Sequence, residues 1–451
     1  MNVLLVSHAF PPVNVIGAVR VGKFAKYLHE AGHGVRVVAA TSSNAALPLE
    51  IPPEYVAYAQ GWARDELFDG AVKLVRRVWS KTRTGSTAEA PAAAPAAAPP
   101  RTASSPRLVR HYYALLRIPD ARAGWIGAAT AAGLELVSDW QPDIVVGSAP
   151  PNSGLVAAAR IARRCGAPWI AELRDLWVDN PYYDNPGWRR ALDHVIERRV
   201  LSTAAGLVSV TPGWSQTLRR RYRQPVACIF NGYVEDDFPA KPTGPPPGDV
   251  VTVLYAGNIY PGYRDPSPLF AAVALLGVER ERVAIDFYGP PPADVLPLAA
   301  AHGVADRVFV HEPVTYKASL ALQTSADVLL LLQWDNVKDA GNIPAKFYEY
   351  LGARRPILFL GYEAGDLAAT VRERGAGVVA NDPAVIAGQL RRWIAQKLGG
   401  IPAPDARARA GMTRDEQFRE YERFLKQFVV RAGSEARPAF SAPSAPAGSP
   451  P

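Results

Sequence analysis

The chain has 451 residues and a formal net charge of +8 at pH 7, a length that predicts two domains of about 150–200 residues each. Its two cysteines are too few for a disulfide framework, no stretch approaches the roughly 20 apolar residues of a membrane span, and we expect no cleavable leader before the first strand. The positive charge favours anionic partners such as nucleotide phosphates or acidic lipids, but the basic residues are scattered, which argues against a nucleic-acid binder.

The first forty residues predict a strand–helix–strand unit. An apolar strand over 3–7 is followed by a helix over about 19–30 and a second strand over 35–39. Gly17 falls at the turn from strand to helix, as in Rossmann-type units, although the full G-x-G-x-x-G pattern is missing. Arg20 lies at the start of the helix, where a solvated arginine would be an ordinary feature.

Two basic segments that contain aromatic residues flank a long stretch of low complexity. Residues 61–81 predict a basic amphipathic helix, which either packs on the N-terminal domain or lies on an anionic membrane surface. Residues 84–106 are rich in alanine and proline, so we expect a disordered loop. The segment 107–117 resumes the domain, and the two basic segments together suggest an acceptor-binding or membrane-facing surface.

The rest of the first 240 residues alternates helices and strands. We expect strands over 142–148, 168–173, 206–210 and 226–230, and helices over 125–140, 154–165, 193–202 and a stretch ending at 222. Arg174 and Asp175 directly follow one strand, at the sheet edge where ligand-binding residues of α/β domains lie. They either hold a ligand hydroxyl or form a structural ion pair. A Pro- and Gly-rich linker over 241–249 then ends the domain.

The pattern restarts after the linker and predicts a second α/β domain. We expect strands over 251–255, 283–288, 308–312, 326–332, 356–360 and 375–379, and helices over 268–276, from 314, over 382–397 and over 414–430. Gly257 and Asn258 form the turn after the first of these strands, and Arg264 lies in the next loop. A planar guanidinium suits two phosphate oxygens, and the alternative is a loop arginine that pairs with Asp265.

Residues 339–361 are the most informative stretch of the sequence. Asn342 is predicted to cap a helix whose first turn holds Pro344, and Lys346 and Glu349 share one face of that helix. A helix start attracts anions such as a diphosphate, Lys346 adds positive charge, and Glu349 can accept hydrogen bonds from two ribose hydroxyls. The same spacing also fits an ordinary strand–helix–strand crossover with a solvated lysine.

The segment Pro344-Ala-Lys346-Phe-Tyr-Glu349-Tyr-Leu-Gly-Ala-Arg-Arg-Pro356 resembles the donor-site signature of retaining glycosyltransferases with the two-domain GT-B fold, which include many bacterial surface-polysaccharide enzymes. The resemblance implies that Lys346 binds the donor diphosphate and Glu349 the ribose. It also implies donor-binding roles for Gly257, Asn258, Arg264, Asn342, Ile343 and Pro344, and acceptor-side roles for Gly17, Arg20, Arg174 and Asp175. One departure is Gly341, which stands where many members carry another glutamate.

The resemblance implies an α/β fold with two Rossmann-like, doubly wound domains that face a central cleft. Residues 1–240 would form the acceptor domain and 250–411 the nucleotide-sugar domain. Residues 412–431 would form a helix that crosses back to the first domain, before a disordered tail over 433–451. The expected localisation is cytoplasmic, with peripheral contact to the inner face of the membrane.

The expected reaction moves a sugar, with retention of configuration, from a nucleotide-sugar to a glycan or lipid-linked acceptor. Arg264 and Lys346 would carry catalysis by stabilising charge on the leaving diphosphate. No metal-ligand cluster is evident in the sequence, so we expect no metal and no other cofactor, and the partners are donor and acceptor but not nucleic acid. Two alternatives stay open: a nucleotide-sugar epimerase on the same scaffold, for which acid and base carboxylates are not evident, and an inactive donor-binding subunit of a polysaccharide assembly complex.

Overall fold

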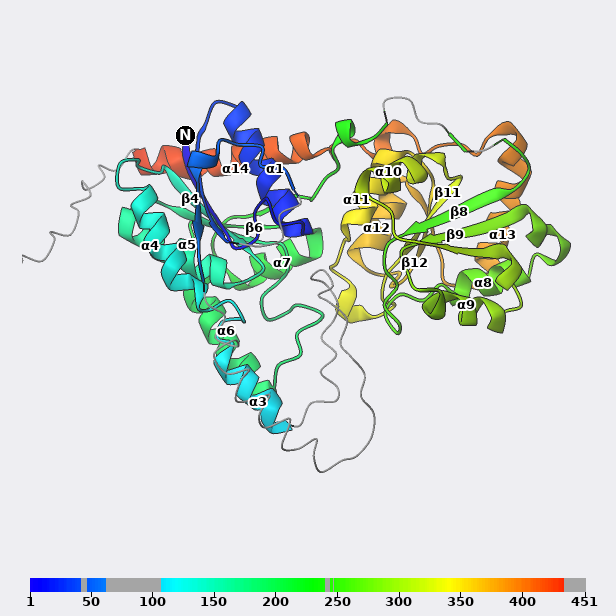
Figure 1. Ribbon diagram of the computed structural model, residues 1–451, viewed down its shortest axis with the longest axis horizontal. Coiled ribbons are helices and arrows are strands. Elements are labelled where there is room, and N and C mark those ends of the chain that lie inside the picture. The colour runs from blue at the N-terminus through cyan, green and yellow to red at the C-terminus, as the bar shows by residue number, and fades with distance from the viewer. Residues whose placement is uncertain (42–46, 62–106, 240–243, 246, 434–451) are drawn as a thin grey trace, which may run out of the picture. The chain divides into compact units, whose positions relative to one another are not determined.

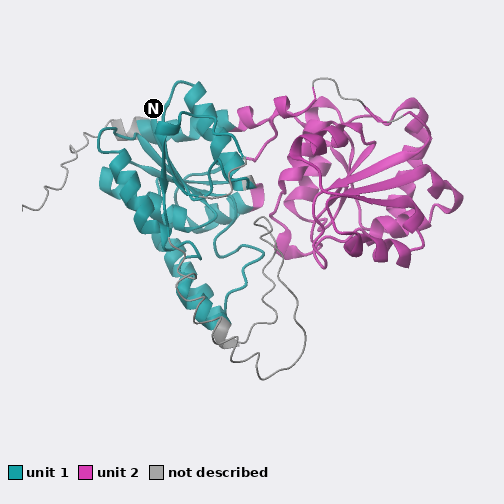
Figure 2. Cartoon of the chain, viewed as in Figure 1, with its two compact units in different colours: residues 1–210, 214–229, 418–451 teal, residues 211–213, 230–417 magenta. Residues whose placement is uncertain are grey.

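The computed structural model describes residues 1–41, 47–61, 107–239, 244, 245 and 247–433, and the chain divides into two compact units (Figure 2). Unit 1 contains Met1–Val210, Trp214–Ile229 and the C-terminal residues from Phe418, and unit 2 contains Thr211–Gly213 and Phe230–Gln417. The predicted basic helix from residue 62 on, the predicted loop over 84–106 and the predicted tail beyond Gly433 lie outside the described residues.

Unit 1 is built on a seven-stranded sheet in the order β3-β2-β1-β4-β5-β6-β7 (Figure 1), and every strand pair is parallel. Its strands are β1 (Asn2–Ser7), β2 (Gly34–Ala40), β3 (Val56–Ala59), β4 (Ile144–Ala149), β5 (Trp169–Leu173), β6 (Gly206–Ser209) and β7 (Val226–Cys228). The chain order reverses between β1 and β4. Sheets of this type bind ligands at the carboxyl ends of the strands beside such a switch point.

Helices cover both faces of the unit 1 sheet. Successive residues of a strand point to opposite faces, and apolar side chains on both faces are buried under helices. Val3 and Leu5 of β1 pack in a cluster with α1 and α14, whereas Leu4 and Val6 pack in a cluster with α4 and α5. The helices of this part of the chain are α1 (Ile16–Glu30), α3 (Arg107–Leu116), α4 (Trp125–Leu136), α5 (Ser153–Cys165), α6 (Gly187–Leu201), α7 (Pro212–Arg221) and α14 (Arg414–Gly433).

Unit 2 repeats this architecture with a six-stranded parallel sheet in the order β10-β9-β8-β11-β12-β13 (Figure 1). Its strands are β8 (Val251–Ala256), β9 (Val283–Tyr288), β10 (Val308–His311), β11 (Val328–Leu332), β12 (Ile357–Leu360) and β13 (Gly377–Val379). One face packs against α8 (Ser267–Ala274), α9 (Pro292–Ala301) and α13 (Pro383–Gln396), and the other against α10 (Tyr316–Ser325), α11 (Ala345–Ala353) and α12 (Asp366–Arg374). The switch point lies between β8 and β11.

The two doubly wound sheets confirm the predicted fold class, but some elements differ from the prediction. Strand β3 and helices α9 and α12 were not predicted, and the helix expected over 125–140 ends at Leu136. Helix α6 begins at Gly187 rather than at Asp193. Its first turn has no apolar periodicity, and instead holds a buried arginine, Arg189, which donates hydrogen bonds to the carbonyl oxygens of Arg117 and Pro119. Those distant contacts leave no periodic signal in the local sequence.

Candidate functional site

Lys346 of α11 lies against the turn that follows β8. Its Nζ atom is 4.6 Å from the centre of the Tyr255 ring. A Cβ atom on Gly257 would collide with that Nζ atom, and Gly257 has a φ of +126°, which disfavours other residues. The glycine therefore leaves room for the ammonium group, and two donor-site residues predicted from separate segments lie together at the carboxyl edge of the sheet.

Arg264 folds back onto the same turn. Its Nη1 atom donates a hydrogen bond to the carbonyl oxygen of Asn258 at 2.9 Å, and its guanidinium lies 4.6 Å from the centre of the Tyr260 ring. Among the described residues no ion pair joins Arg264 to Asp265, so that predicted alternative is wrong; the Asp265 carboxylate accepts a hydrogen bond from the backbone N–H of Ser267 at 2.9 Å. Because an arginine has five N–H donors, several stay available to a ligand.

The prediction that Asn342 caps α11 is wrong. Pro344 occupies the cap position and no side chain caps the helix. Asn342 instead donates its side-chain N–H to Asp339 at 3.2 Å, and its carbonyl oxygen accepts a hydrogen bond from Gln333 at 2.8 Å. The first-turn N–H groups of α11, which follows Ile343 and Pro344, are thus left without a capping side chain, and such groups can bind an anion.

Glu349 lies one turn further along α11 and is half-buried. Its Oε2 atom accepts a hydrogen bond from Nε2 of Gln323 on α10 at 3.1 Å. Burial raises the pKa of Glu349, whereas this hydrogen bond and the charge of Lys346 act in the opposite direction. Sequence reasoning missed Gln323, because no local pattern shows which residue of α10 faces α11.

Asp339 is a second residue that sequence reasoning missed as a site residue, although it begins the stretch that was singled out. Its side chain is buried beside Asn342 and Gln333, and burial raises its pKa to about 6. Its position shortly after β11, at the carboxyl edge of the sheet, is the signal that could have found it.

Replacing Asp339 with asparagine should stabilise the protein at neutral and higher pH. Because burial raises the pKa of Asp339 from 3.8 to about 6, the folded state disfavours the ionised form, and the stability deficit grows as the pH rises through this window. We expect Asp339→Asn to gain up to about 3 kcal/mol of unfolding free energy at pH 8, with the gain shrinking between pH 6 and pH 4. Urea unfolding at pH 8, 6 and 4.5 measures this, with exposed Asp335→Asn as control. A pH-independent gain, or a loss, would contradict the expectation.

Arg174 and Asp175 lie at the carboxyl end of β5 in unit 1. The Arg174 guanidinium donates hydrogen bonds to the carbonyl oxygens of Ala149 at 3.1 Å and Pro150 at 2.8 Å. In the part of the chain that the structure describes, no ion pair joins Arg174 to Asp175, so the predicted ion pair is wrong. Burial raises the pKa of Asp175, and its half-buried carboxyl remains available for a ligand hydroxyl.

Gly17 and Arg20 take different places from those predicted. Gly17 is inside the first turn of α1, not in the preceding turn, and a Cβ atom there would collide with the Arg174 guanidinium. Arg20 is not a solvated arginine: it is 3% exposed and forms a 3.0 Å ion pair with Glu172. Arg20 also donates a hydrogen bond to the Ile229 carbonyl oxygen at 3.2 Å. It therefore holds β5 in place rather than facing a ligand, and Glu172 is the partner that sequence reasoning missed.

The described residues contain neither a cluster of metal ligands nor a membrane-spanning helix. Among those residues, no group of three or more His, Cys, Asp or Glu side chains is arranged to hold a metal ion. None of the described helices combines the length and apolar character needed to cross a membrane.

Comparison with known proteins adds a match to one domain family and a fold. Residues 17–232 match the glycosyl transferase 4-like domain family, whereas no curated protein has a similar sequence. Similar solved structures include HepE of Anabaena with UDP (TM-score 0.61, 12% identity, 95% of this chain and 100% of that chain). Others are a glycosyltransferase from Rickettsia africae (0.56, 13%, 95% and 98%) and the lipopolysaccharide outer core galactosyltransferase WaaB in its apo form (0.55, 12%, 95% and 99%). At these identities the structural likeness shows the fold, which is the two-domain GT-B fold.

Proposed function

We propose that this chain, a GT-B glycosyltransferase with a glycosyl transferase 4-like domain over residues 17–232, moves a sugar from a nucleotide-sugar donor to a glycan or lipid-linked acceptor of the bacterial cell surface. The observation that carries the proposal is the contact between Lys346 and the turn at Gly257. Lys346 lies on α11 one helical turn before Glu349. HepE has been solved with UDP and with UDP-glucose, and WaaB is a lipopolysaccharide galactosyltransferase by name. The HepE structures support a nucleotide-sugar donor, and the likeness to WaaB supports a surface-glycan acceptor.

The proposed chemistry rests on positive charge at the carboxyl edge of the unit 2 sheet. As the bond between sugar and diphosphate breaks, negative charge grows on the departing phosphate. Lys346, Arg264 and the uncapped N–H groups of α11 would stabilise that charge, and Glu349 would hold the ribose hydroxyls. We propose that these groups suffice without a metal ion or other cofactor, and that the acceptor hydroxyl attacks from the face that the diphosphate leaves, which retains the configuration.

The acceptor side of the proposal concerns unit 1. Asp175, held beside Arg174 at the end of β5, would accept a hydrogen bond from the acceptor hydroxyl. Helix α3 exposes Leu115 to 61% and Tyr112 to 36%, and its Arg110 side chain is also exposed. A helix with exposed apolar and basic residues suits an anionic membrane surface, which supports peripheral association with the inner face of the cytoplasmic membrane.

A thermal-shift panel tests the donor site. UDP, GDP, ADP, TDP and their sugar forms are added to the wild type, to Arg264→Ala and to a control variant. The control is Lys338→Ala, which removes an exposed lysine from the segment that precedes α11. A ligand at about 100 times its Kd should stabilise the protein by about 2.7 kcal/mol. We expect one base to stabilise the wild type and the control, and to stabilise Arg264→Ala much less.

The other outcomes of the panel are equally informative. If no nucleotide or nucleotide-sugar stabilises the wild type, the proposed donor site is wrong. If a nucleotide-sugar stabilises the wild type but is neither transferred nor converted, the inactive donor-binding subunit is favoured. If a nucleotide-sugar binds but is converted to its epimer without an acceptor, the epimerase alternative replaces transfer.

A further inference from the structure

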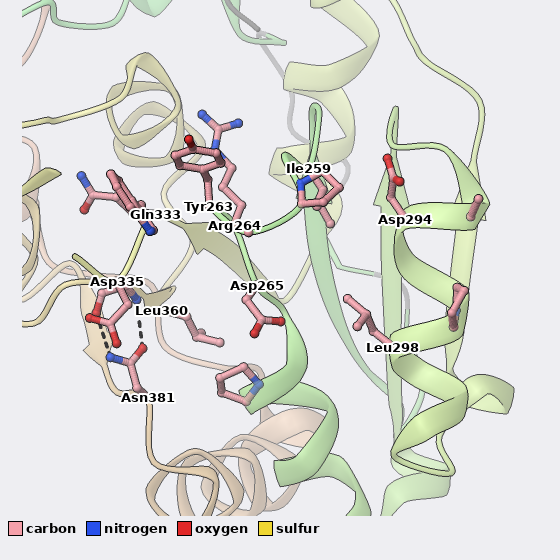
Figure 3. Close-up of a pocket in the computed structure, with 17 residues that line it drawn as sticks. Ile259, Tyr263, Arg264, Asp265, Asp294, Leu298, Gln333, Asp335, Leu360 and Asn381 are labelled. Atoms are coloured by element: carbon pink, nitrogen blue, oxygen red, sulfur yellow. Dashed lines mark hydrogen bonds between the residues drawn. The ribbon is translucent and has the colours of Figure 1, made fainter. Parts of the chain in front are cut away.

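A cavity opens at the carboxyl edge of the unit 2 sheet, on the side of α8 and α9 (Figure 3). Its volume of about 580 Å³ is within the range of roughly 300–1,000 Å³ that is usual for small-molecule sites. Loops after β8, β11, β12 and β13 and the start of α9 contribute its walls. Arg264 lines it, but Lys346 and Glu349 do not, because α11 packs on the opposite face of the sheet.

The charge of the cavity lining disfavours a diphosphate. Three carboxylates, from Asp265, Asp294 and Asp335, line it against a single cation, Arg264. In Figure 3 the Arg264 guanidinium extends away from Asp265, and one of its N–H groups is bonded to the carbonyl oxygen of Asn258. A diphosphate held among the three carboxylates would be repelled by their excess negative charge, whereas carboxylate oxygens are strong acceptors for neutral hydroxyl donors.

Two of these carboxylates are free to receive a ligand. In the part of the chain that the structure describes, neither Asp294 nor Asp335 has a hydrogen bond or ion pair to its carboxylate, whereas Asp265 accepts one from Ser267. Asp294 is in the first turn of α9, where the helix dipole by itself accounts for an acidic residue. Asp335 is in no helix, so no helix dipole explains an acidic residue at this position. Asp335 is therefore the better residue to substitute in a test of ligand binding.

Aromatic and apolar side chains form the rest of the wall. The rings of Tyr263 and Trp334 meet edge to face with centroids 4.8 Å apart, and both line the cavity beside Leu298 and Leu360. Aromatic surface packs well on the C–H face of a sugar ring, while carboxylates at the margin hydrogen-bond its hydroxyls. Apolar walls with a few convergent polar groups are the usual composition of a specific small-molecule site.

We propose that this cavity binds a neutral sugar ring, with Trp334 packing on the ring and Asp335 and Asp294 accepting hydrogen bonds from its hydroxyls. The ring belongs either to the nucleotide-sugar donor or to a saccharide acceptor. The donor source rests on the proposed function, whereas the acceptor source does not require the donor site.

Saturation-transfer NMR and titration calorimetry test this with UDP, UDP-glucose, UDP-galactose and a panel of neutral mono- and disaccharides. The variants are Trp334→Leu and Asp335→Asn, and the control is Glu281→Gln, which neutralises an exposed carboxylate of unit 2 outside the cavity. We expect both cavity variants to weaken sugar binding at least about 10-fold, with UDP affinity within about twofold of the wild type. Glu281→Gln should match the wild type for every ligand.

The ligand that responds identifies the source of the ring. If the cavity variants lose affinity only for the UDP-hexoses, the cavity binds the donor sugar. If they lose affinity for a free saccharide that binds without UDP, the cavity binds the acceptor. Three results would overturn the proposal: no sugar in any form binds, the variants bind sugars normally, or UDP affinity falls as much as sugar affinity. A wild type that binds a free saccharide but no nucleotide would keep this site and refute the proposed function instead. Because Asp335 is exposed, its variant stays informative if Trp334→Leu misfolds.

Discussion

Lys346→Ala should lower kcat at least 100-fold while the protein stays folded. If the ammonium group stabilises the departing diphosphate, its loss removes a preorganised charge, which costs about 3–4 kcal/mol in the transition state. The structural cost should be small. The contact that the structure shows for Nζ is with the Tyr255 ring, and a cation–π contact contributes about 0.5–1 kcal/mol at such sites. Turnover of the donor identified by the ligand panel, and the Tm, measure the two effects.

Lys338→Ala is the matched control for Lys346→Ala. It removes the same charge from an exposed position in the loop before α11, so a general effect of net charge would appear in both variants. We expect the control to keep wild-type turnover and the Lys346→Ala Tm to fall by no more than about 2–4 °C. Wild-type turnover in Lys346→Ala would refute the assigned donor site, and an equal loss in both variants would point to long-range electrostatics.

Arg20→Ala should destabilise unit 1 by about 3–5 kcal/mol, because it leaves the charge of Glu172 buried and unpaired. The ion-pair side chains are 3% and 4% exposed, and Glu172 also accepts a hydrogen bond from the Ser148 hydroxyl at 2.5 Å. Arg20 also donates a hydrogen bond to the Ile229 carbonyl oxygen, so removing its side chain takes this donor away from a second buried acceptor. Chemical unfolding of the full chain, followed by a unit 1 signal such as Trp125 fluorescence in single-tryptophan form, measures the loss.

A double-mutant cycle separates the ion pair from the rest of the Arg20 environment. Glu172→Ala alone should also destabilise, and Arg20→Ala/Glu172→Ala should lose less than the sum of the two single losses, because no unpaired charge remains. If Arg20→Ala instead keeps wild-type stability but loses acceptor binding, Arg20 contacts the ligand directly and the structural role assigned to it is wrong.

Local sequence patterns were sufficient for the framework of the donor site. The apolar run over 326–332 predicts β11, and helical periodicity after Pro344 puts Lys346 and Glu349 on one face of α11, as observed. The turn with Gly257 was likewise identified from its place after an apolar strand. These predictions succeed because strand and helix periodicities are set by neighbouring residues.

The predictions that failed depend on contacts between distant parts of the chain. Gly17 was expected in a turn, yet the structure places it in α1, where the Arg174 guanidinium occupies the position that a Cβ atom would take. Arg20 was expected in solvent or at a ligand, yet it is buried against Glu172. Asn342 was expected to cap α11, yet its side chain bonds to Asp339. Each of these residues could contact several partners, and the packing of distant segments determines which contact forms.

The sequence by itself therefore determined the succession of strands and helices, the two doubly wound units and the helix that carries Lys346 and Glu349. The tertiary structure alone decided which partners Arg20, Arg174 and Asn342 take, that Asp339 is buried, and that a cavity with Trp334 and Asp335 adjoins Arg264. The physical reason is the range of the interactions. Backbone periodicity acts over a few residues, whereas burial, ion pairing and cavity shape arise where loops from distant strands meet at one edge of a sheet.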